Sequence, residues 1–318
     1  MPVAEKQLTP DRLNFEGSLS RSEIERLLKD DDLRVVQTSG PIDDKTLRRL
    51  NDSLFAERPD LEFRVYGFYS EPCDLSFLAQ MTNVQRLSAD CLHHASGIEA
   101  IAEIPLLKRL SIGIWNLEEF DFLSDVSDQV ESLFLGGTKS KKPDLSPLSR
   151  FRNLKTIYLE GQKKNIEVVS GLHNLEDVTL RSITVPSLDF LVPLKKLWSL
   201  DIKLGGTRNL AAIEGMNHLK YLELWQIKGL TDIRVVSTLT GLQHLFLQAL
   251  TQVSAIPDLR ALRNLRRITM DTMKGLKDVS ALRDAPALTE YIHIAASNLQ
   301  PSEYGKEWAE FRSFEFSE

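Results

Sequence analysis

The chain has 318 residues, of which 42% are apolar, with a formal net charge of −6 and a sequence pI near 5.7. This balance excludes the broad positive field that neutralises phosphates, so we expect no nucleic-acid partner. The two cysteines are too few for a disulfide framework, and neither a signal peptide nor a run of about 18 apolar residues occurs. We therefore expect a cytoplasmic protein with no membrane partner; secretion by a signal-independent route is the alternative.

The first part of the chain carries strand and helix patterns at long spacing. The segment Ser20-Arg21-Ser22-Glu23 has the sequence of a capping box and precedes an amphipathic helix. A strand is predicted at 33–36, a second helix at about 44–57 and a second strand at 61–66. We interpret residues 1–74 as an N-terminal cap built on a longer α/β repeat, because the end of a repeat array would otherwise expose its core.

From residue 75 onward one apolar pattern recurs, L-x-x-L-x-x-L-x-x-L-x-x-L-x-L. Its end alternates with period two, as a half-buried strand does, whereas the triplet spacing suits a 3₁₀ or short helical return. The first apolar residue of each strand, which we call the marker, recurs every 21 to 24 residues, at Leu87, Leu110, Leu133, Ile157, Val178, Leu200, Leu222, Leu245, Ile268 and Tyr291. These markers predict about ten stacked strand–turn–helix units over residues 75–296.

This pattern resembles the leucine-rich-repeat family, and its repeat length resembles the short, internalin-like bacterial class. The resemblance implies an α/β solenoid, a right-handed superhelix with a concave parallel β-sheet and a helical or 3₁₀ convex side. The family's asparagine, five positions after the marker, is missing here; that column reads Leu92, Trp115, Thr138, Gln162, Ile183, Gly205, Ile227, Leu250 and Met273. The turn amides must then be satisfied by backbone or water, because a buried unpaired donor costs about 1–3 kcal/mol.

The last segment, residues 297–318, is rich in aromatic residues that stand among charges. They are Tyr304, Trp308, Phe311, Phe314 and Phe316. We predict that this segment folds over the last repeat as a C-terminal cap.

Strand alternation indicates which side chains face the concave side. The marker and the residue two after it enter the core, so the residues one before, one after and three after it face outward. Aromatic rings in these columns predict a protein-binding surface, since large aromatics supply much of an interface's energy. Its residues are Tyr221, Glu223, Trp225, His244 and Phe246 on adjacent strands, Asp201 and Lys203 next to them, and a smaller patch of Phe134 and Tyr158. The alternative is that these rings only cover the sheet.

Candidate chemistry is sparse. Cys91, His93 and His94 carry metal-ligand chemistry, but their spacing matches no usual zinc site, and a loop is the simpler interpretation. No phosphate-binding loop or nucleophile elbow occurs. Glu160 and Glu223 would have to share one closed pocket to act as acid and base. We expect no catalytic residue, no metal, no cofactor and no enzymatic activity.

The sequence therefore favours a monomeric, non-enzymatic scaffold that binds a folded protein on its concave face. The alternative is a cytoplasmic inhibitor or immunity-type protein that occludes a toxin or regulates an enzyme. An acidic chain would suit a basic toxin.

Overall fold

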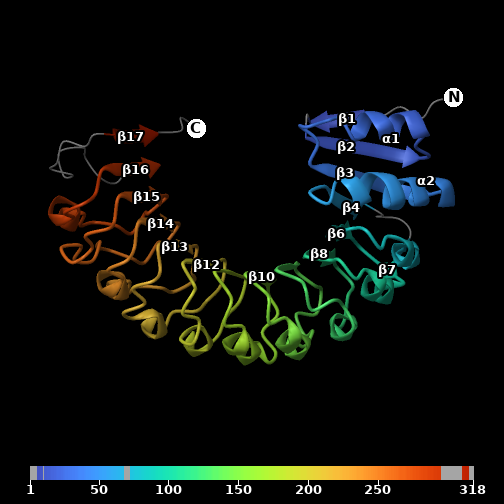
Figure 1. Cartoon of the computed structure of the whole chain (residues 1–318). Helices are drawn as coiled ribbons and strands as arrows, with labels where there is room; N and C mark the ends of the chain where they lie inside the picture. Colours follow the sequence, from blue (N-terminus) through green and yellow to red (C-terminus); the bar gives the residue numbers. More distant parts are fainter. Residues whose placement is uncertain (1–5, 10, 68–71, 295–309, 315–318) are drawn as a thin grey trace. The chain divides into compact units, whose positions relative to one another are not determined.

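The computed structural model describes residues 6–9, 11–67, 72–294 and 310–314, the first and last of these ranges by their backbone alone. The chain divides into two compact units, Met1–Ile157 and Tyr158–Glu318. In each unit short strands alternate with helical turns, which lie along one side of the strands (Figure 1).

The first unit holds a sheet whose strands follow chain order. They are β1 (Lys6–Thr9), β2 (Arg12–Gly17), β3 (Val35–Ile42), β4 (Glu62–Tyr66), β6 (Arg86–Leu92), β8 (Arg109–Ile114) and β9 (Ser132–Leu135). β1 is antiparallel to β2, and the pairs from β2 to β9 are parallel. β5 (Cys73–Asp74) and β7 (Ala95–Ser96) form a separate parallel pair. The helices are α1 (Arg21–Leu27), α2 (Asp44–Arg49), the π-helix η1 (Leu50–Phe55) and the 3₁₀ helices η2 (Ser76–Gln80), η3 (Ile98–Glu103), η4 (Asp121–Ser124) and η5 (Ser146–Arg150).

The second unit repeats one element pair with little variation. Its parallel strands are β11 (Asp177–Arg181), β12 (Ser199–Lys203), β13 (Tyr221–Trp225), β14 (His244–Gln248), β15 (Arg267–Asp271), β16 (Glu290–Ile294) and β17 (Glu310–Phe314). The 3₁₀ helices are η6 (Ile166–Gly171), η7 (Asp189–Leu191), η8 (Ala211–Ile213), η9 (Arg234–Thr238) and η10 (Ser280–Asp284). The boundary between the two units falls within β10 (Thr156–Glu160).

The predicted repeat is confirmed in phase as well as in length. Every marker is the second residue of its strand, from Leu87 in β6 to Tyr291 in β16. Markers also pair with markers across the sheet, as Leu200 does with Leu222 and Leu245 with Ile268. Each marker is at most 1% exposed, so the triplet leucines and the strand apolar residues form one stacked core per unit.

The turns after the strands use backbone hydrogen bonds in place of an asparagine ladder, as expected. In the second unit the residue four after the marker is left-handed, with φ of 55° at Leu204 and 49° at Gln226. The Leu204 amide donates to the Trp225 carbonyl at 2.9 Å, and the Gln226 amide donates to the Gln248 carbonyl at 2.8 Å. The next residue then points inward, so that Ile183, Ile227, Leu250 and Met273 extend the core.

The start of six returns is stabilised by a side chain that the sequence analysis did not single out. Thirteen residues before the marker, a side-chain oxygen accepts the backbone N–H two residues further on. The residues are Asp74, Asp144, Ser187, Asn209, Asp232 and Asp278. Such local bonds favour a tight turn over an extended chain, and they open the short 3₁₀ helices.

The N-terminal segment contains the predicted capping box, in which Ser20 accepts the Glu23 amide and Glu23 accepts the Ser20 amide. The predicted second helix begins at Asp44 but continues as a π-helix from Leu50. The structure also contains β2 before the first helix, a strand that the sequence analysis missed. Residues 297–309 and 315–318 of the predicted C-terminal cap lie outside the described residues, and β17 pairs in parallel with β16.

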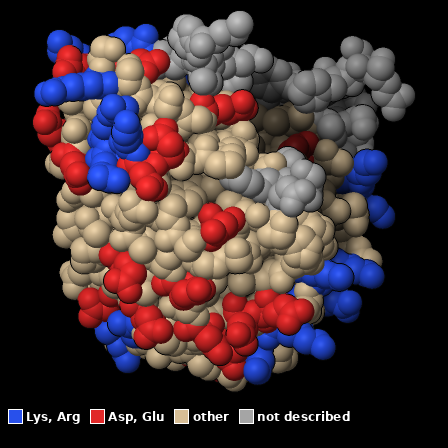
Figure 2. Space-filling view, turned by 90° about the vertical axis from the view of Figure 1, so that its right-hand side faces the viewer, with Lys and Arg blue, Asp and Glu red and all other residues tan. Residues whose placement is uncertain are grey.

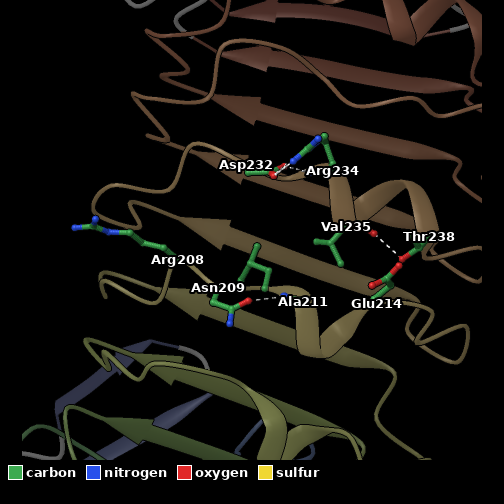
Figure 3. A pocket seen from close by; sticks show the side chains of 9 residues that line it. Arg208, Asn209, Ala211, Glu214, Asp232, Arg234, Val235 and Thr238 are labelled. Carbon is green, nitrogen blue, oxygen red and sulfur yellow. Dashed lines mark hydrogen bonds and ion pairs between the residues drawn. The ribbon is translucent and has the colours of Figure 1, made fainter.

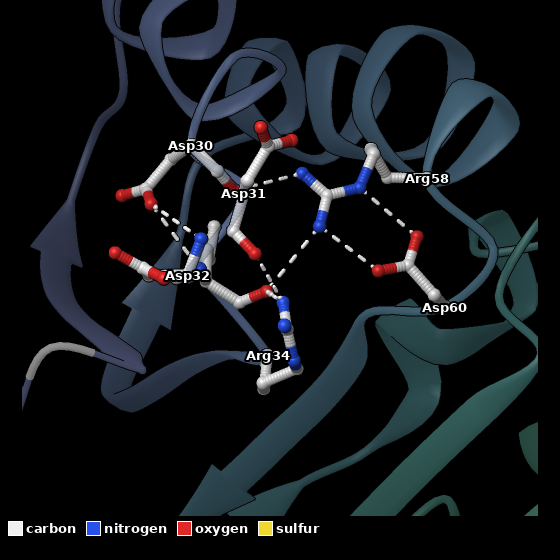
Figure 4. A network of polar contacts seen from close by, with 7 residues as sticks. Asp30, Asp31, Asp32, Arg34, Arg58 and Asp60 are labelled. Atoms are coloured by element: carbon white, nitrogen blue, oxygen red, sulfur yellow. Dashed lines mark hydrogen bonds and ion pairs between the residues drawn. The ribbon is translucent and has the colours of Figure 1, made fainter.

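Arg58 joins the loops that follow the first two helices (Figure 4). Its guanidinium donates to the Asp30 carbonyl at 3.0 Å and the Leu33 carbonyl at 3.3 Å. It also donates to both carboxylate oxygens of Asp60 at 2.9 Å. The Asp30 carbonyl also accepts the Leu33 amide and the Leu33 carbonyl also accepts Arg34 Nη1, so Arg58 adds a charged donor to a turn that is already closed by hydrogen bonds.

A buried histidine makes stability depend on pH. His293 is 0% exposed, and its Nδ1 lies 3.0 Å from the Tyr291 hydroxyl. Burial lowers the pKa of His293 to about 4. Because the unfolded pKa is near 6.5, stability is complete above that value and is lost as pH falls from about 6.5 towards about 4.

We expect the wild-type free energy of unfolding to fall by about 2 kcal/mol more than that of His293→Leu between pH 7 and pH 5. Urea unfolding at both pH values measures this difference. An equal loss of unfolding free energy in the two proteins would show that His293 has the same pKa in the folded and in the unfolded chain.

Candidate functional site

The side chains of β11–β16 that point away from the core form a surface that we call the open face. In register across β12, β13 and β14 lie Asp201, Glu223 and Phe246. Tyr221 pairs with His244 one position before the markers, and Lys203 pairs with Trp225 at the end of the strands. Seven of the eight predicted residues of this unit therefore stand on three adjacent strands, and the eighth, Tyr158, stands on β10.

Lys203 lies between two carboxylates at the centre of this face. Its Nζ is 3.2 Å from Asp201 Oδ2 and 3.2 Å from Glu223 Oε1. The side chains are 19%, 15% and 11% exposed for Lys203, Asp201 and Glu223. Burial raises the pKa of Asp201, and the attraction of Lys203 opposes that shift. Asp201 Oδ1 is covered and has no hydrogen-bond partner in the described part of the chain.

The aromatic residues beside the triad of Lys203, Asp201 and Glu223 are held by polar contacts. The Tyr221 hydroxyl donates to Glu223 Oε2 at 2.9 Å, and its ring meets His244 edge-on with centroids 5.1 Å apart. His244 Nε2 lies 3.2 Å from Thr269 Oγ1. Burial raises the pKa of Tyr221 and lowers that of His244, so both rings are neutral at pH 7. Phe246 is half-buried in the next row.

A second chain of contacts leads to Tyr158. The Tyr158 hydroxyl donates to Glu160 Oε2 at 3.1 Å, and Arg181 Nε donates to Glu160 Oε1 at 3.1 Å. The Arg181 guanidinium also lies 5.5 Å from the centre of the Trp225 ring, within the range of a cation–π contact. Phe134 belongs to the first unit, where it is 36% exposed on β9 and its ring lies beside Gly136.

The carboxylates of the open face do not meet in one pocket. Glu160 and Glu223 stand on β10 and β13, three strands apart, which corresponds to about 14 Å at the usual strand spacing. Each already accepts a tyrosine hydroxyl and lies beside a base. Their separation removes this pair as a general acid and base.

The return side of the second unit holds a cavity of about 410 Å³ near Arg208, Glu214, Asp232 and Thr238 (Figure 3). Arg208 points away from the other side chains in this view. Asp232 pairs with Arg234 of its own turn, and the Thr238 hydroxyl donates to the Val235 carbonyl at 2.7 Å. These groups stabilise the 3₁₀ turns, and they do not converge on a common point.

The cysteine and histidines near the end of β6 are part of a turn. Cys91 is an exposed residue of β6 with φ of 54°, and partial desolvation of its thiol, followed by the charge of Asp90, raises its pKa. The rings of His93 and His94 meet edge-on at 4.7 Å, and the Asn116 amide contacts His94. Among the described residues, no group of three or more His, Cys, Asp or Glu side chains could hold a metal ion.

Figure 2 shows charges of both signs on a side of the molecule that is mostly uncharged, with several carboxylates gathered in its lower part. No helix in the described ranges is long and apolar enough to cross a membrane.

Comparisons with known proteins identify the fold. No protein-family model and no curated protein matches the chain. An internalin (inlF) from Listeria monocytogenes str. 4b F2365 is similar over 88% of this chain and 86% of its own, with a TM-score of 0.57 and 19% identity. TLR13, solved as a complex with ssRNA13, is similar over 89% of this chain and 54% of its own, with a TM-score of 0.50 and 17% identity. At these identities the likeness is one of fold. Together with the repeat of 21 to 24 residues, it shows that this chain has the leucine-rich-repeat fold in its short, internalin-like form.

Proposed function

We propose that the protein is a non-enzymatic recognition scaffold that binds a folded protein through the open face of its second unit. The observation that carries the proposal is the group of half-buried rings, Tyr221, Trp225, His244 and Phe246, on a sheet face that no other element in the described part of this unit covers. Rings held by hydrogen bonds and packing lose little freedom on binding, so more of their contact energy remains as affinity. Tyr158 would extend this footprint.

The charge of the face favours a protein over a nucleic acid. A nucleic acid would bring its phosphates against Glu160, Asp201 and Glu223, and the bases of the face, Arg181, Lys203 and Arg267, are each already paired with a carboxylate. The two free cysteines, Cys73 and Cys91, support a function in a reducing compartment such as the cytoplasm. Phe134 is a separate candidate contact on the first unit.

We expect Trp225→Ala combined with Phe246→Ala to weaken partner binding at least about tenfold, because each change removes a large ring from the centre of the surface. The partner is first captured from the native host with the wild-type protein. It is then purified and titrated against both proteins by calorimetry.

Trp115→Ala is the matched control, since Trp115 is 47% exposed and belongs to the first unit. The wild type, the double variant and Trp115→Ala must have the same melting temperature, so that weaker binding is not the result of unfolding. If the double variant bound as tightly as the wild type, the rings would only cover the sheet.

Inhibition of an enzyme, such as a toxin, is a narrower form of the same function. The excess of carboxylates on the open face favours it, because a basic active-site surface would be attracted there. The captured partner would then lose turnover on binding, and the double variant would restore it. A partner with no catalytic activity would exclude this form.

A further inference from the structure

We infer that the open face over β11–β13 docks a basic protein, with a Lys or Arg side chain of that partner lying against Asp177 and Asp201. The inference rests on the proposed function and narrows its partner class. The open face is the docking surface, and its negative charge selects a basic partner.

The charges on this part of the face do not balance. On β11–β16 the outward columns hold the carboxylates Asp177, Asp201, Glu223, Asp271 and Glu290 and the bases Arg181, Lys203 and Arg267. Two of the three bases are committed elsewhere, because Arg181 pairs with Glu160 and Arg267 pairs with Glu290. Lys203 alone remains to face Asp177, Asp201 and Glu223, which leaves an excess of two negative charges.

Lys203 forms ion pairs with two of these three carboxylates, Asp201 and Glu223. It bridges Asp201 and Glu223 at 3.2 Å each, and Asp177 stands on the neighbouring strand β11. Asp201 Oδ1 is covered, with no hydrogen-bond partner in the described residues. A carboxylate withdrawn from water is screened less than an exposed one, so its field at the surface is stronger.

Folding disfavours the ionised forms of Asp177 and Asp201. Burial is the largest effect on both Asp177 and Asp201, and it raises the pKa of each. Their charge therefore lowers the stability of the free protein at neutral pH. A Lys or Arg side chain of the partner would offset this loss of stability on binding. The charge of the two aspartates would therefore favour a basic partner.

The neighbouring groups fit a protein cation better than a metal ion. The Lys203 ammonium already lies between two carboxylates, where it would repel a divalent cation. The rings of Tyr221 and Trp225 both stand on β13, one strand from Asp201 and two strands from Asp177. Ring faces beside carboxylates suit the long stem and charged head of Arg or Lys.

The test uses a displayed library of one small folded domain whose surface positions are randomised. Binders to the full-length wild-type protein are selected at physiological salt, about 0.15 M. We expect the selected domains to be enriched in Lys and Arg relative to the unselected library. Their affinity should fall steeply as salt is raised, because the attraction is electrostatic.

Asp177→Asn and Asp201→Asn should each weaken these binders about tenfold while leaving the melting temperature unchanged or higher. Glu214→Gln is the matched control, since it removes one carboxylate from the return side, beside η8. Replacing the contacting Arg of a binder with Gln completes a double-mutant cycle, which shows a coupling with Asp201 if the two groups meet.

Binders that carry no cationic enrichment but are lost with Trp225→Ala plus Phe246→Ala would overturn the inference and leave the proposed function standing. Binders insensitive to that double variant would contradict both. A dimer of the protein that Asp201→Asn dissociates would show that the occupant is a second copy, and it too would overturn the inference.

Discussion

Lys203→Met is expected to destabilise the protein by about 3 kcal/mol at pH 7, because it leaves two largely buried carboxylates facing each other without a base. Asp201 and Glu223 both lie 3.2 Å from the Lys203 ammonium, and their side chains are only 15% and 11% exposed. Methionine fills the space of the lysine stem, so the lost charge dominates the effect.

The penalty depends on pH in a defined direction. Without Lys203 the folded-state pKa of Asp201 rises further, since burial already raises it and lysine opposes that rise. An acid with a raised folded pKa destabilises the fold above that pKa, and protonation relieves the loss as pH falls through it. Urea unfolding should therefore show a smaller difference between variant and wild type at pH 4 than at pH 7.

The double variant Lys203→Met with Asp201→Asn should recover most of the stability, because only Glu223 then keeps its charge. Lys220→Met, at an exposed position next to β13, is the control and should change the free energy of unfolding by less than about 0.5 kcal/mol. If Lys203→Met changed the free energy of unfolding as little as Lys220→Met, water would screen the charges of Lys203, Asp201 and Glu223, and their contacts would not stabilise the fold.

Gly205→Ala is expected to cost about 3 kcal/mol, because the new methyl group would overlap a backbone atom that cannot be displaced alone. A Cβ at Gly205 would meet the Ile183 carbonyl oxygen of the preceding repeat well inside contact distance. Moving that oxygen would disturb the turn after β11. Chemical denaturation of the purified variant measures the loss.

Gly206→Ala is the control for the same turn. There a Cβ would lie 3.1 Å from Thr184 Oγ1 and 3.3 Å from Thr184 Cγ2, and this side chain can rotate. We expect a loss of at most about 1 kcal/mol. Equal losses at the two positions would show that the backbone of this turn adjusts, and that Gly205 is not required by close approach.

The repeat array, and the side chains that lie on each face of its sheet, can be predicted from the alternation of apolar and polar residues along the chain. Period-two alternation at Leu222 and Leu224 requires that Tyr221, Glu223 and Trp225 lie on the other face, whatever packs around them. A regular repeat then brings equivalent positions together, so His244 and Phe246 necessarily become their neighbours. The seven predicted residues on β12, β13 and β14 could be grouped for this reason alone.

Some local features escaped the sequence analysis although a signal was present. Arg12-Leu13-Asn14-Phe15 alternates as a strand should, and it forms most of β2, but no repeat marker accompanied it. The Asp, Asn or Ser thirteen residues before the marker recurs in phase with the leucines and opens the 3₁₀ returns. Each could have been found by aligning the repeats at their polar as well as their apolar positions.

The sequence by itself determined the strand–turn–helix unit, its number of copies and the face on which each side chain stands, because these depend on periods of two and three along a single chain. Only the tertiary structure decided which groups pair. Lys203 could have bonded to any acid within reach of its long stem, and it bridges Asp201 and Glu223 because the register places them on either side. The same packing covers Asp201 Oδ1 and buries His293, since burial depends on neighbours from other repeats that are distant in the sequence.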